Sequence, residues 1–338
     1  MGVVVLSILA LILKRAECQT ASSTVPVQTI QLPHVTSHFD HFGVDPDGGR
    51  LFATLQTENL VQVDQLQTGR EPGTIAGIGK PHAVLFRQDL DRLFITDGNH
   101  DLGIVHIVDG KTFAVLKNID LAAGAEQYSQ DPATKYMYVG NGGHDTSQPC
   151  SFVSIIDMNR GEKTGDIKVD TPNLEAITLE AKGNRLYAND RLNGRILVID
   201  RKQRTEFTSW PIAGAKRNIA LALNETHHRL FVGCRSGVIV VFNTRDGKQI
   251  ATLPVGEDID DLMYDPGSKR IFAPTGGGNG ALSIYWEKDP DHYALETTIA
   301  TGPGGKNGIF VTTVHKYFVG VPQHGTTTDD EILVYGVQ

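Results

Sequence analysis

Cysteine is scarce in this sequence, and the few cysteines exclude the common cysteine-based sites. The 338 residues include only Cys18, Cys150 and Cys234. No two of them are spaced as C-x-x-C, the pattern found in zinc ribbons and thioredoxin-like redox centres. The sequence therefore predicts neither kind of site.

Recognisable catalytic motifs are also missing. The chain has no Gly-x-Ser-x-Gly nucleophile elbow, which excludes the serine hydrolases that depend on it. The glycine run Gly276-Gly277-Gly278 lacks the Lys-Ser/Thr that completes a phosphate-binding loop. The sequence thus leaves open whether the protein is an enzyme.

Positive charge is in deficit. The sequence has 31 Lys and Arg against 39 Asp and Glu, a formal net charge of −8. A protein that binds nucleic acid through its phosphates usually carries a basic excess. The composition therefore disfavours nucleic acid as a partner.

Long apolar runs are absent except at the N-terminus. Val3–Leu13 is too short to span a bilayer and has the length of a signal-peptide core. Small residues at Ala16 and Cys18 predict cleavage before Gln19. We expect residues 1–18 to be a signal peptide whose basic start is missing, or a short N-terminal anchor.

This segment predicts a periplasmic or secreted protein with no transmembrane span in its mature chain. A lipid anchor on Cys18 is the weaker alternative, because Arg15-Ala16-Glu17 differs from the apolar and small residues that normally precede a lipidated cysteine.

The strongest pattern is a short aromatic segment that follows a basic residue and recurs every 41 to 50 residues. A period near 44 residues is that of one four-stranded propeller blade. The copies are Arg50-Leu51-Phe52, Arg92-Leu93-Phe94, Lys135-Tyr136-Met137-Tyr138, Arg185-Leu186-Tyr187, Arg229-Leu230-Phe231, Arg270-Ile271-Phe272 and Lys316-Tyr317-Phe318. The repeat predicts an all-β, seven-bladed β-propeller over residues 19–338.

The last repeat lacks its outer strand, and this predicts how the ring closes. The chain ends after the third strand of that repeat, whereas residues 25–32 alternate in polarity before the first repeat. We expect this N-terminal strand to complete the last blade and remove the open sheet edges. The predicted blades are about 39–81, 82–124, 125–172, 173–216, 217–258, 259–304, and 305–338 with 25–32.

Several second strands carry a further signature. Phe94-Ile95-Thr96-Asp97, Tyr138-Val139-Gly140-Asn141 and Tyr187-Ala188-Asn189-Asp190 are variants of Tyr-Val-Thr-Asn. With Val44-Asp45-Pro46 and Leu197-Val198-Ile199-Asp200, the sequence resembles the YncE-like, YVTN-repeat bacterial β-propellers over about residues 25–338. The resemblance implies an exported seven-bladed propeller and implies no single reaction.

Propeller geometry brings the starts of the inner strands to one face, around the mouth of the central channel. Counting back from the basic residue of each repeat reaches the start of the inner strand. A polar or charged residue stands at this position in every blade, whereas a strand that faces only the core would begin with an apolar residue. The residues are Asp40, His41, His82, Glu126, Glu175, Arg217, Asn218, Asp260, Asp261, Lys306 and Asn307.

The turns between second and third strands reach the same face. Asp97–Asp101 and Gly140–Asp145 are sister sequences that carry His100 and His144, and the last blade contributes His324. Together with His38, His41 and His82, they place six of the twelve histidines near one rim.

Three interpretations of these groups stay open. They can be solvated channel residues, or they can bind an anionic or polar ligand through Arg217, Arg235 and Lys306. They can also hold a divalent metal, where histidine with carboxylate suits zinc, iron or copper and an all-oxygen set suits calcium. The candidate metal ligands are His41, His82, Glu126, Glu175 and Asp260.

We expect a non-catalytic binding or scaffold protein, monomeric, that binds a small molecule or a protein at the channel mouth. One alternative is a metal-dependent, lactonase-like hydrolase with a divalent ion in the central channel. A periplasmic protein-interaction platform is the other. No cofactor beyond a divalent metal is predicted.

Overall fold

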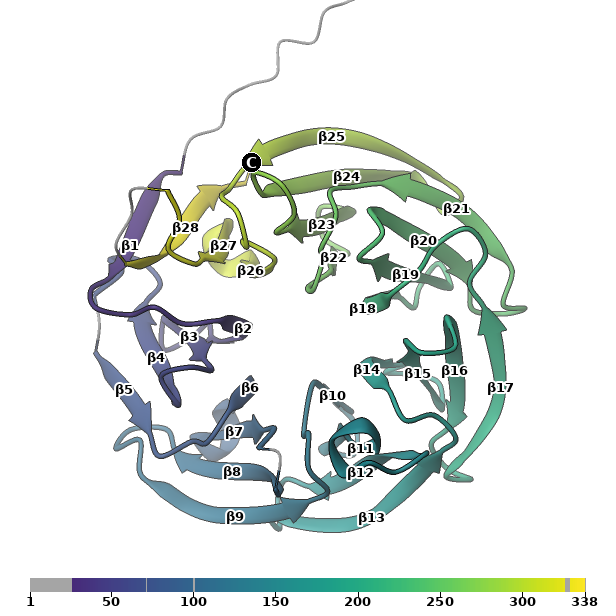
Figure 1. Ribbon diagram of the computed structural model, residues 1–338, viewed down its shortest axis with the longest axis horizontal. Helices are drawn as coiled ribbons and strands as arrows, with labels where there is room; N and C mark the ends of the chain where they lie inside the picture. The colour runs from purple at the N-terminus through teal and green to yellow at the C-terminus, as the bar shows by residue number, and fades with distance from the viewer. Residues whose placement is uncertain (1–25, 71, 100, 326–328, 338) are drawn as a thin grey trace, which may run out of the picture.

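The protein is an all-β, seven-bladed propeller. A computed structural model describes residues 26–70, 72–99, 101–325 and 329–337, which form seven four-stranded antiparallel sheets arranged in a ring (Figure 1). The predicted signal-peptide or anchor segment, residues 1–18, lies outside the described residues. Within the described part of the chain, no helix has both the length and the apolar composition needed to cross a membrane.

Each blade runs from an inner strand at the channel to an outer strand at the rim. The first three blades comprise β2 (Phe39–Asp45), β3 (Arg50–Leu55), β4 (Leu60–Gln65) and β5 (Gly73–Ala76); β6 (Pro81–Arg87), β7 (Arg92–Asp97), β8 (Gly103–Asp109) and β9 (Val115–Leu121); and β10 (Tyr128–Gln130), β11 (Tyr136–Gly142), β12 (Ser151–Asp157) and β13 (Glu162–Val169).

The next three blades follow the same order. They comprise β14 (Leu174–Leu179), β15 (Arg185–Asp190), β16 (Arg195–Asp200) and β17 (Thr205–Pro211); β18 (Asn218–Asn224), β19 (Arg229–Cys234), β20 (Val238–Asn243) and β21 (Gln249–Pro254); and β22 (Met263–Asp265), β23 (Arg270–Thr275), β24 (Ala281–Asp289) and β25 (His292–Ala300). Short 3-10 helices occur at Gln88–Leu90, Gly143–Thr146 and Thr312–Val314.

The seventh blade joins the two ends of the chain, as the sequence predicts. Its strands are β26 (Asn307–Val311), β27 (Lys316–Val321), β28 (Asp330–Gly336) and, outermost, β1 (Gln28–Leu32). Ile30 pairs with Ile332 in antiparallel register, and its side chain is buried. The N-terminal strand therefore covers the edge of β28, which would otherwise expose unpaired backbone groups.

The repeated aromatic residues form the core between blades. Phe272 of blade 6 stacks on Phe310 of blade 7 with ring centroids 4.6 Å apart, and neither ring is substantially exposed. The basic anchor before each aromatic residue has its own role, shown by Arg50. It pairs with Asp45 at 2.7 Å and places its guanidinium 4.9 Å from the ring centre of Phe86 in the next blade. Arg50 thus stabilises both the turn within blade 1 and the contact between blades 1 and 2.

Candidate functional site

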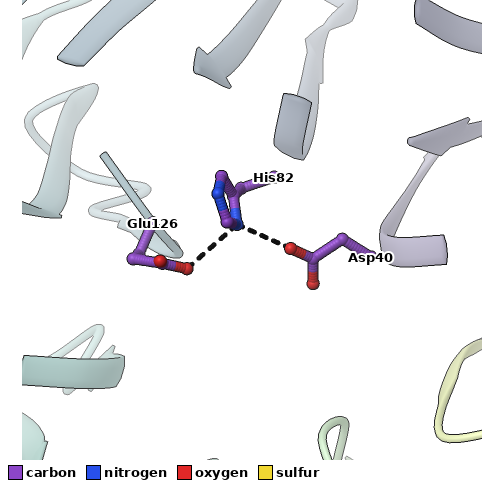
Figure 2. A group of neighbouring side chains, drawn as sticks. All are labelled: Asp40, His82 and Glu126. Atoms are coloured by element: carbon purple, nitrogen blue, oxygen red, sulfur yellow. Dashed lines mark ion pairs between the residues drawn. The ribbon is translucent and has the colours of Figure 1, made fainter. Parts of the chain in front are cut away.

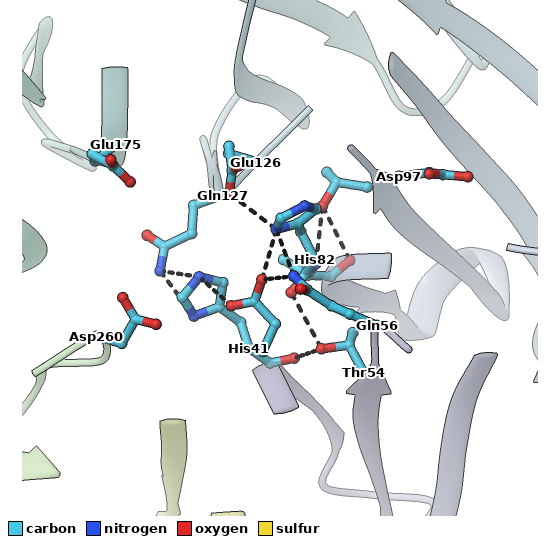
Figure 3. Close-up of polar contacts among 12 residues, drawn as sticks. His41, Thr54, Gln56, His82, Asp97, Glu126, Gln127, Glu175 and Asp260 are labelled. Carbon is cyan, nitrogen blue, oxygen red and sulfur yellow. Dashed lines mark hydrogen bonds and ion pairs between the residues drawn. The ribbon is translucent and has the colours of Figure 1, made fainter. Parts of the chain in front are cut away.

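A polar cavity of about 290 Å³ lies at the mouth of the central channel, with residues of all seven blades in its wall. We call it the mouth cavity. Figure 3 shows part of its wall, where side chains from different blades point toward one another. Its lining residues are His38, Phe39, Asp40, His41, Gln56, Lys80, His82, Glu126, Gln127, Glu175, Ala176, Arg191, Ile219, Arg235, Asp260 and Lys306.

Irregularities in the inner strands place polar side chains in this cavity. The register between first and second strands shifts between Phe39 and Phe42 in blade 1, and between Pro81 and Ala83 in blade 2. Blade 4 has a similar shift between Leu174 and Ile177. A β-bulge adds a residue that does not pair regularly and redirects its side chain. The bulged positions include Asp40, His41, His82 and Glu175, which accounts for polar residues at the start of otherwise apolar strands.

His82 stands between two carboxylates that come from the neighbouring blades (Figure 2). Its Nδ1 atom lies 2.6 Å from Asp40 Oδ2 and 3.0 Å from Glu126 Oε2. The Gln56 side chain donates a hydrogen bond of 2.6 Å to the same Asp40 oxygen. The histidine side chain is only 4% exposed, so water screens these interactions weakly.

His41 extends this cluster across the channel. Its Nε2 atom lies 3.2 Å from Asp40 Oδ1, and its Nδ1 atom lies 2.6 Å from Asp261 Oδ1. The Gln127 amide lies against the same ring, with its nitrogen 2.8 Å from Nε2. Glu126, His82, Asp40, His41 and Asp261 thus form one continuous chain of alternating carboxylate and imidazole groups.

These contacts explain the electrostatics of the two histidines. Burial alone would lower both pKa values, but the adjacent carboxylates outweigh it. Asp40 and Asp261 raise the pKa of His41 from 6.5 to about 10. Glu126 and Asp40 raise the pKa of His82 from 6.5 to about 10. Burial opposes ionisation of Asp40, yet the two histidines hold its pKa below its usual value. Both imidazoles are therefore positively charged at neutral pH.

The opposite wall carries a second set of ion pairs. Arg191 donates to Glu175 Oε1 at 2.9 Å, while Arg235 and Lys306 bind the two oxygens of Asp260 at 2.7 and 3.2 Å. Burial and the negative charge of Glu126 raise the pKa of Glu175, and Arg191 offsets this only in part. A cation at the centre of the cavity would relieve that repulsion.

The remaining predicted site residues lie outside the lining of the mouth cavity. Asn218 and Asn307 are buried, and Asn218 donates to Asn189 at 2.8 Å within the packing between blades. Arg217 is exposed and donates to the Arg235 carbonyl. Two predicted histidines also lie outside this lining. His144 lines a small pocket between blades 3 and 4, and His324 Nδ1 lies 3.0 Å from the Pro322 carbonyl oxygen. His100 lies outside the described residues.

Three polar residues of the cavity wall, Gln56, Lys80 and Gln127, are not among the site residues predicted from the sequence. Gln56 occupies the turn after β3, and Gln127 follows Glu126 directly. In other blades, the equivalent positions carry charged residues that the sequence predicts to line the channel mouth. Lys80 precedes β6, and among the described residues it forms no ion pair. The two glutamines are uncharged, so their residue type does not indicate a binding site, whereas their place in the repeat does.

Asp40, His82 and Glu126 form a group that could hold a metal ion. One ligand atom from each lies within 4.8 Å of the other two. Two carboxylate oxygens and one imidazole nitrogen fit zinc, iron or copper better than calcium, which prefers oxygen alone. His41, Glu175 and Asp260 line the same cavity but make ion pairs elsewhere in it.

Comparisons with known proteins support the fold alone. No family profile and no curated protein matches the sequence. Among solved structures, a chain of "Crystal Structure of Mitotic Checkpoint Complex" has a TM-score of 0.75 at 14% identity, covering 100% of this chain and 99% of that chain. A chain of Kuenenia stuttgartiensis hydrazine synthase has a TM-score of 0.74 at 17% identity, covering 91% and 99%. At such low identity, these likenesses establish a seven-bladed β-propeller and assign no family.

Proposed function

We propose that this propeller is a non-catalytic binding protein that takes a divalent metal ion in its mouth cavity. The observation that carries the proposal is the convergence of Asp40, His82 and Glu126, from three blades, on one space no wider than 4.8 Å. Propellers commonly serve as binding scaffolds, and the function lies in the site rather than in the fold.

The contacts of His82 support this role. A protonated His82 occupies the position between the carboxylates of Asp40 and Glu126, and its charge holds them together. A divalent cation would replace that proton and satisfy the same two carboxylates, with neutral His82 as its nitrogen ligand. Glu175 lies nearby, and the repulsion between it and Glu126 would also fall.

Metal analysis and calorimetry test the proposal. Protein purified without a histidine tag should retain about one zinc, iron or copper per chain, and the metal-stripped protein should rebind zinc stoichiometrically. Glu126→Gln and Asp40→Asn should each weaken zinc binding at least tenfold, since each removes one charged ligand. Asp258→Asn is the matched control, because Asp258 lies on the same face outside the cluster and pairs with Arg235. Equal affinity in all four proteins would overturn the proposal.

A metal-dependent hydrolase is the second candidate, and one observation favours it. Three protein ligands facing a cavity of about 290 Å³ leave a coordination position for water and room for a small substrate. Zinc-loaded protein would then hydrolyse simple lactones or esters, and Glu126→Gln would abolish turnover. If the protein binds zinc but hydrolyses none of these substrates, the hydrolase proposal is excluded and the binding proposal stands.

The cellular setting belongs to the same proposal. The Tyr-Val-Thr-Asn variants support a YncE-like protein, and the apolar run Val3–Leu13 supports export to the periplasm or beyond. Cell fractionation, with mass spectrometry of the mature N-terminus, tests export. A chain that begins at Gln19 and stays monomeric in solution is the expected product.

A further inference from the structure

A second cavity continues the channel below the mouth cavity. It has a volume of about 370 Å³ and, like the mouth cavity, draws its wall from all seven blades. We call it the throat cavity. Its lining residues are His41, Phe42, Ala83, Gln127, Tyr128, Ser129, Gln130, Ile177, Thr178, Leu221, Asp261, Leu262, Met263, Gly308 and Ile309.

His41 and Gln127 belong to the walls of both cavities. Both ring nitrogens of His41 are held, one by Asp40 and one by Asp261, and the Gln127 amide rests on the ring (Figure 3). His41 is therefore held in place by two ion pairs, and Gln127 by its contact with the ring, where the two cavities meet.

The two cavities differ in charge. The mouth cavity is lined by carboxylates, arginines, lysines and histidines. Among the described residues of the throat wall, His41 and Asp261 are the only histidine, lysine, arginine, aspartate or glutamate side chains, and they pair at 2.6 Å. The rest of the wall carries no charge, and polar atoms make up more of its exposed surface than apolar atoms do. Gln127, Ser129, Gln130 and Thr178 supply hydrogen-bonding groups, beside apolar side chains of the inner strands.

Apolar residues of the inner strands also remain partly exposed here. Leu221, Met263 and Ile309 are only half-buried, although they lie on the inner strands β18, β22 and β26. A concave site of this size that offers both apolar side chains and hydrogen-bonding groups can hold a small molecule. Burying an unpaired charge in such a place is costly, whereas hydroxyl and amide groups can be satisfied.

We propose that the throat cavity is a second ligand site, specific for a compact uncharged organic molecule that carries a hydroxyl or amide group. Its body would contact Leu221, Met263 and Ile309, and its polar group would bond to Thr178, Ser129 or Gln127. The site does not require a metal in the mouth cavity.

Three matched probes test the charge preference. Benzyl alcohol, benzylammonium and benzoate share one ring and differ in charge, and their binding can be followed by ligand-observed NMR. We expect benzyl alcohol to bind at least tenfold more tightly than either ion. Equal binding of the three probes, or no binding of benzyl alcohol, would overturn the proposal.

Filling the cavity tests its location. Leu221→Trp and Ile309→Trp, in different blades, should each weaken benzyl alcohol binding at least tenfold. Leu192→Trp is the matched control, since Leu192 is 65% exposed and lines neither cavity. Glu175→Gln, in the mouth cavity, should leave binding of the alcohol unchanged.

Two measurements keep these results interpretable. Thermal unfolding shows which variants fold, and zinc titration of the same proteins reports the mouth cavity separately, so that either site can fail without the other. A crystal soaked in benzyl alcohol should show the ring beside Leu221. Electron density for benzyl alcohol in the mouth cavity would contradict the assignment. This test uses the unmodified protein, so it does not depend on whether the variants fold.

Discussion

The carboxylate of Asp40 contacts two histidines at once, His82 through Oδ2 at 2.6 Å and His41 through Oδ1 at 3.2 Å. The three residues come from two blades, and all three are largely buried. One carboxylate therefore holds two positive charges at the inner ring. This arrangement leads to a pH dependence that a solvated channel mouth would not have.

Stability should fall as the solution becomes alkaline. The folded pKa values of His41 and His82 are raised from 6.5 to about 10. Their contribution to stability is therefore complete below about pH 6.5 and is lost as pH rises toward 10. Each imidazolium contributes a slope of about 1.4 kcal/mol per pH unit in that window. Urea denaturation between about pH 7 and 9 measures it.

Asp40→Asn provides the control for that slope. Without the shared carboxylate, both histidine pKa values should fall, and the loss of stability above neutral pH should become shallower. The variant should also be less stable at neutral pH by about 3–5 kcal/mol, the usual cost of removing one partner of a buried ion pair. An unchanged slope would show that other groups dominate the alkaline transition.

Zinc affinity should depend on pH in the opposite direction. The metal must displace the proton of His82, whose pKa is about 10. Apparent affinity should therefore rise about tenfold per pH unit between about pH 6 and 7.5. Calorimetry in buffers of different ionisation enthalpy should detect about one proton released per zinc. Binding without proton release would exclude His82 as a ligand.

Gly98 should be needed for the position of the His82 ring. A Cβ atom at this residue would come too close to the ring, only 2.5 Å from His82 Cδ2. Gly98→Ala should therefore displace the ring and weaken zinc binding several-fold, while the fold survives. Gly267→Ala serves as the comparison, because its nearest neighbour would be 3.5 Å away. Equal zinc affinity in the two variants would contradict this role.

The N-terminal strand should contribute strongly to stability. Ile30 is 5% exposed and packs in the core that joins blades 7 and 1. Ile30→Ala should cost about 2–5 kcal/mol, as for other large-to-small core changes. Gln31→Ala, on the exposed side of the same strand, should change stability by about 0.5 kcal/mol or less. Guanidinium denaturation of both variants tests the closure of the ring.

The amino-acid sequence by itself determined the architecture. Its repeated aromatic strands, such as Arg50-Leu51-Phe52, recur at the blade period, and the unpaired strand before the first repeat matches the missing strand of the last. Local patterns decide these features, because strand polarity and turn residues are encoded over a few neighbouring residues. Counting back from the basic residue of each repeat also identified Asp40, His82 and Glu126 as polar residues at the starts of inner strands.

Only the tertiary structure decided which of those residues meet. Asn218 and Asp261 occupy similar sequence positions, yet one packs between blades and the other binds His41 in the channel. Asn218 stands at a register shift in β18, whereas Asp261 precedes the short strand β22, so the local backbone direction differs at the two positions. Such directions depend on packing against neighbouring blades. The contact of His41 with Gln127, and the two cavities that both residues line, therefore exist only once the ring has closed.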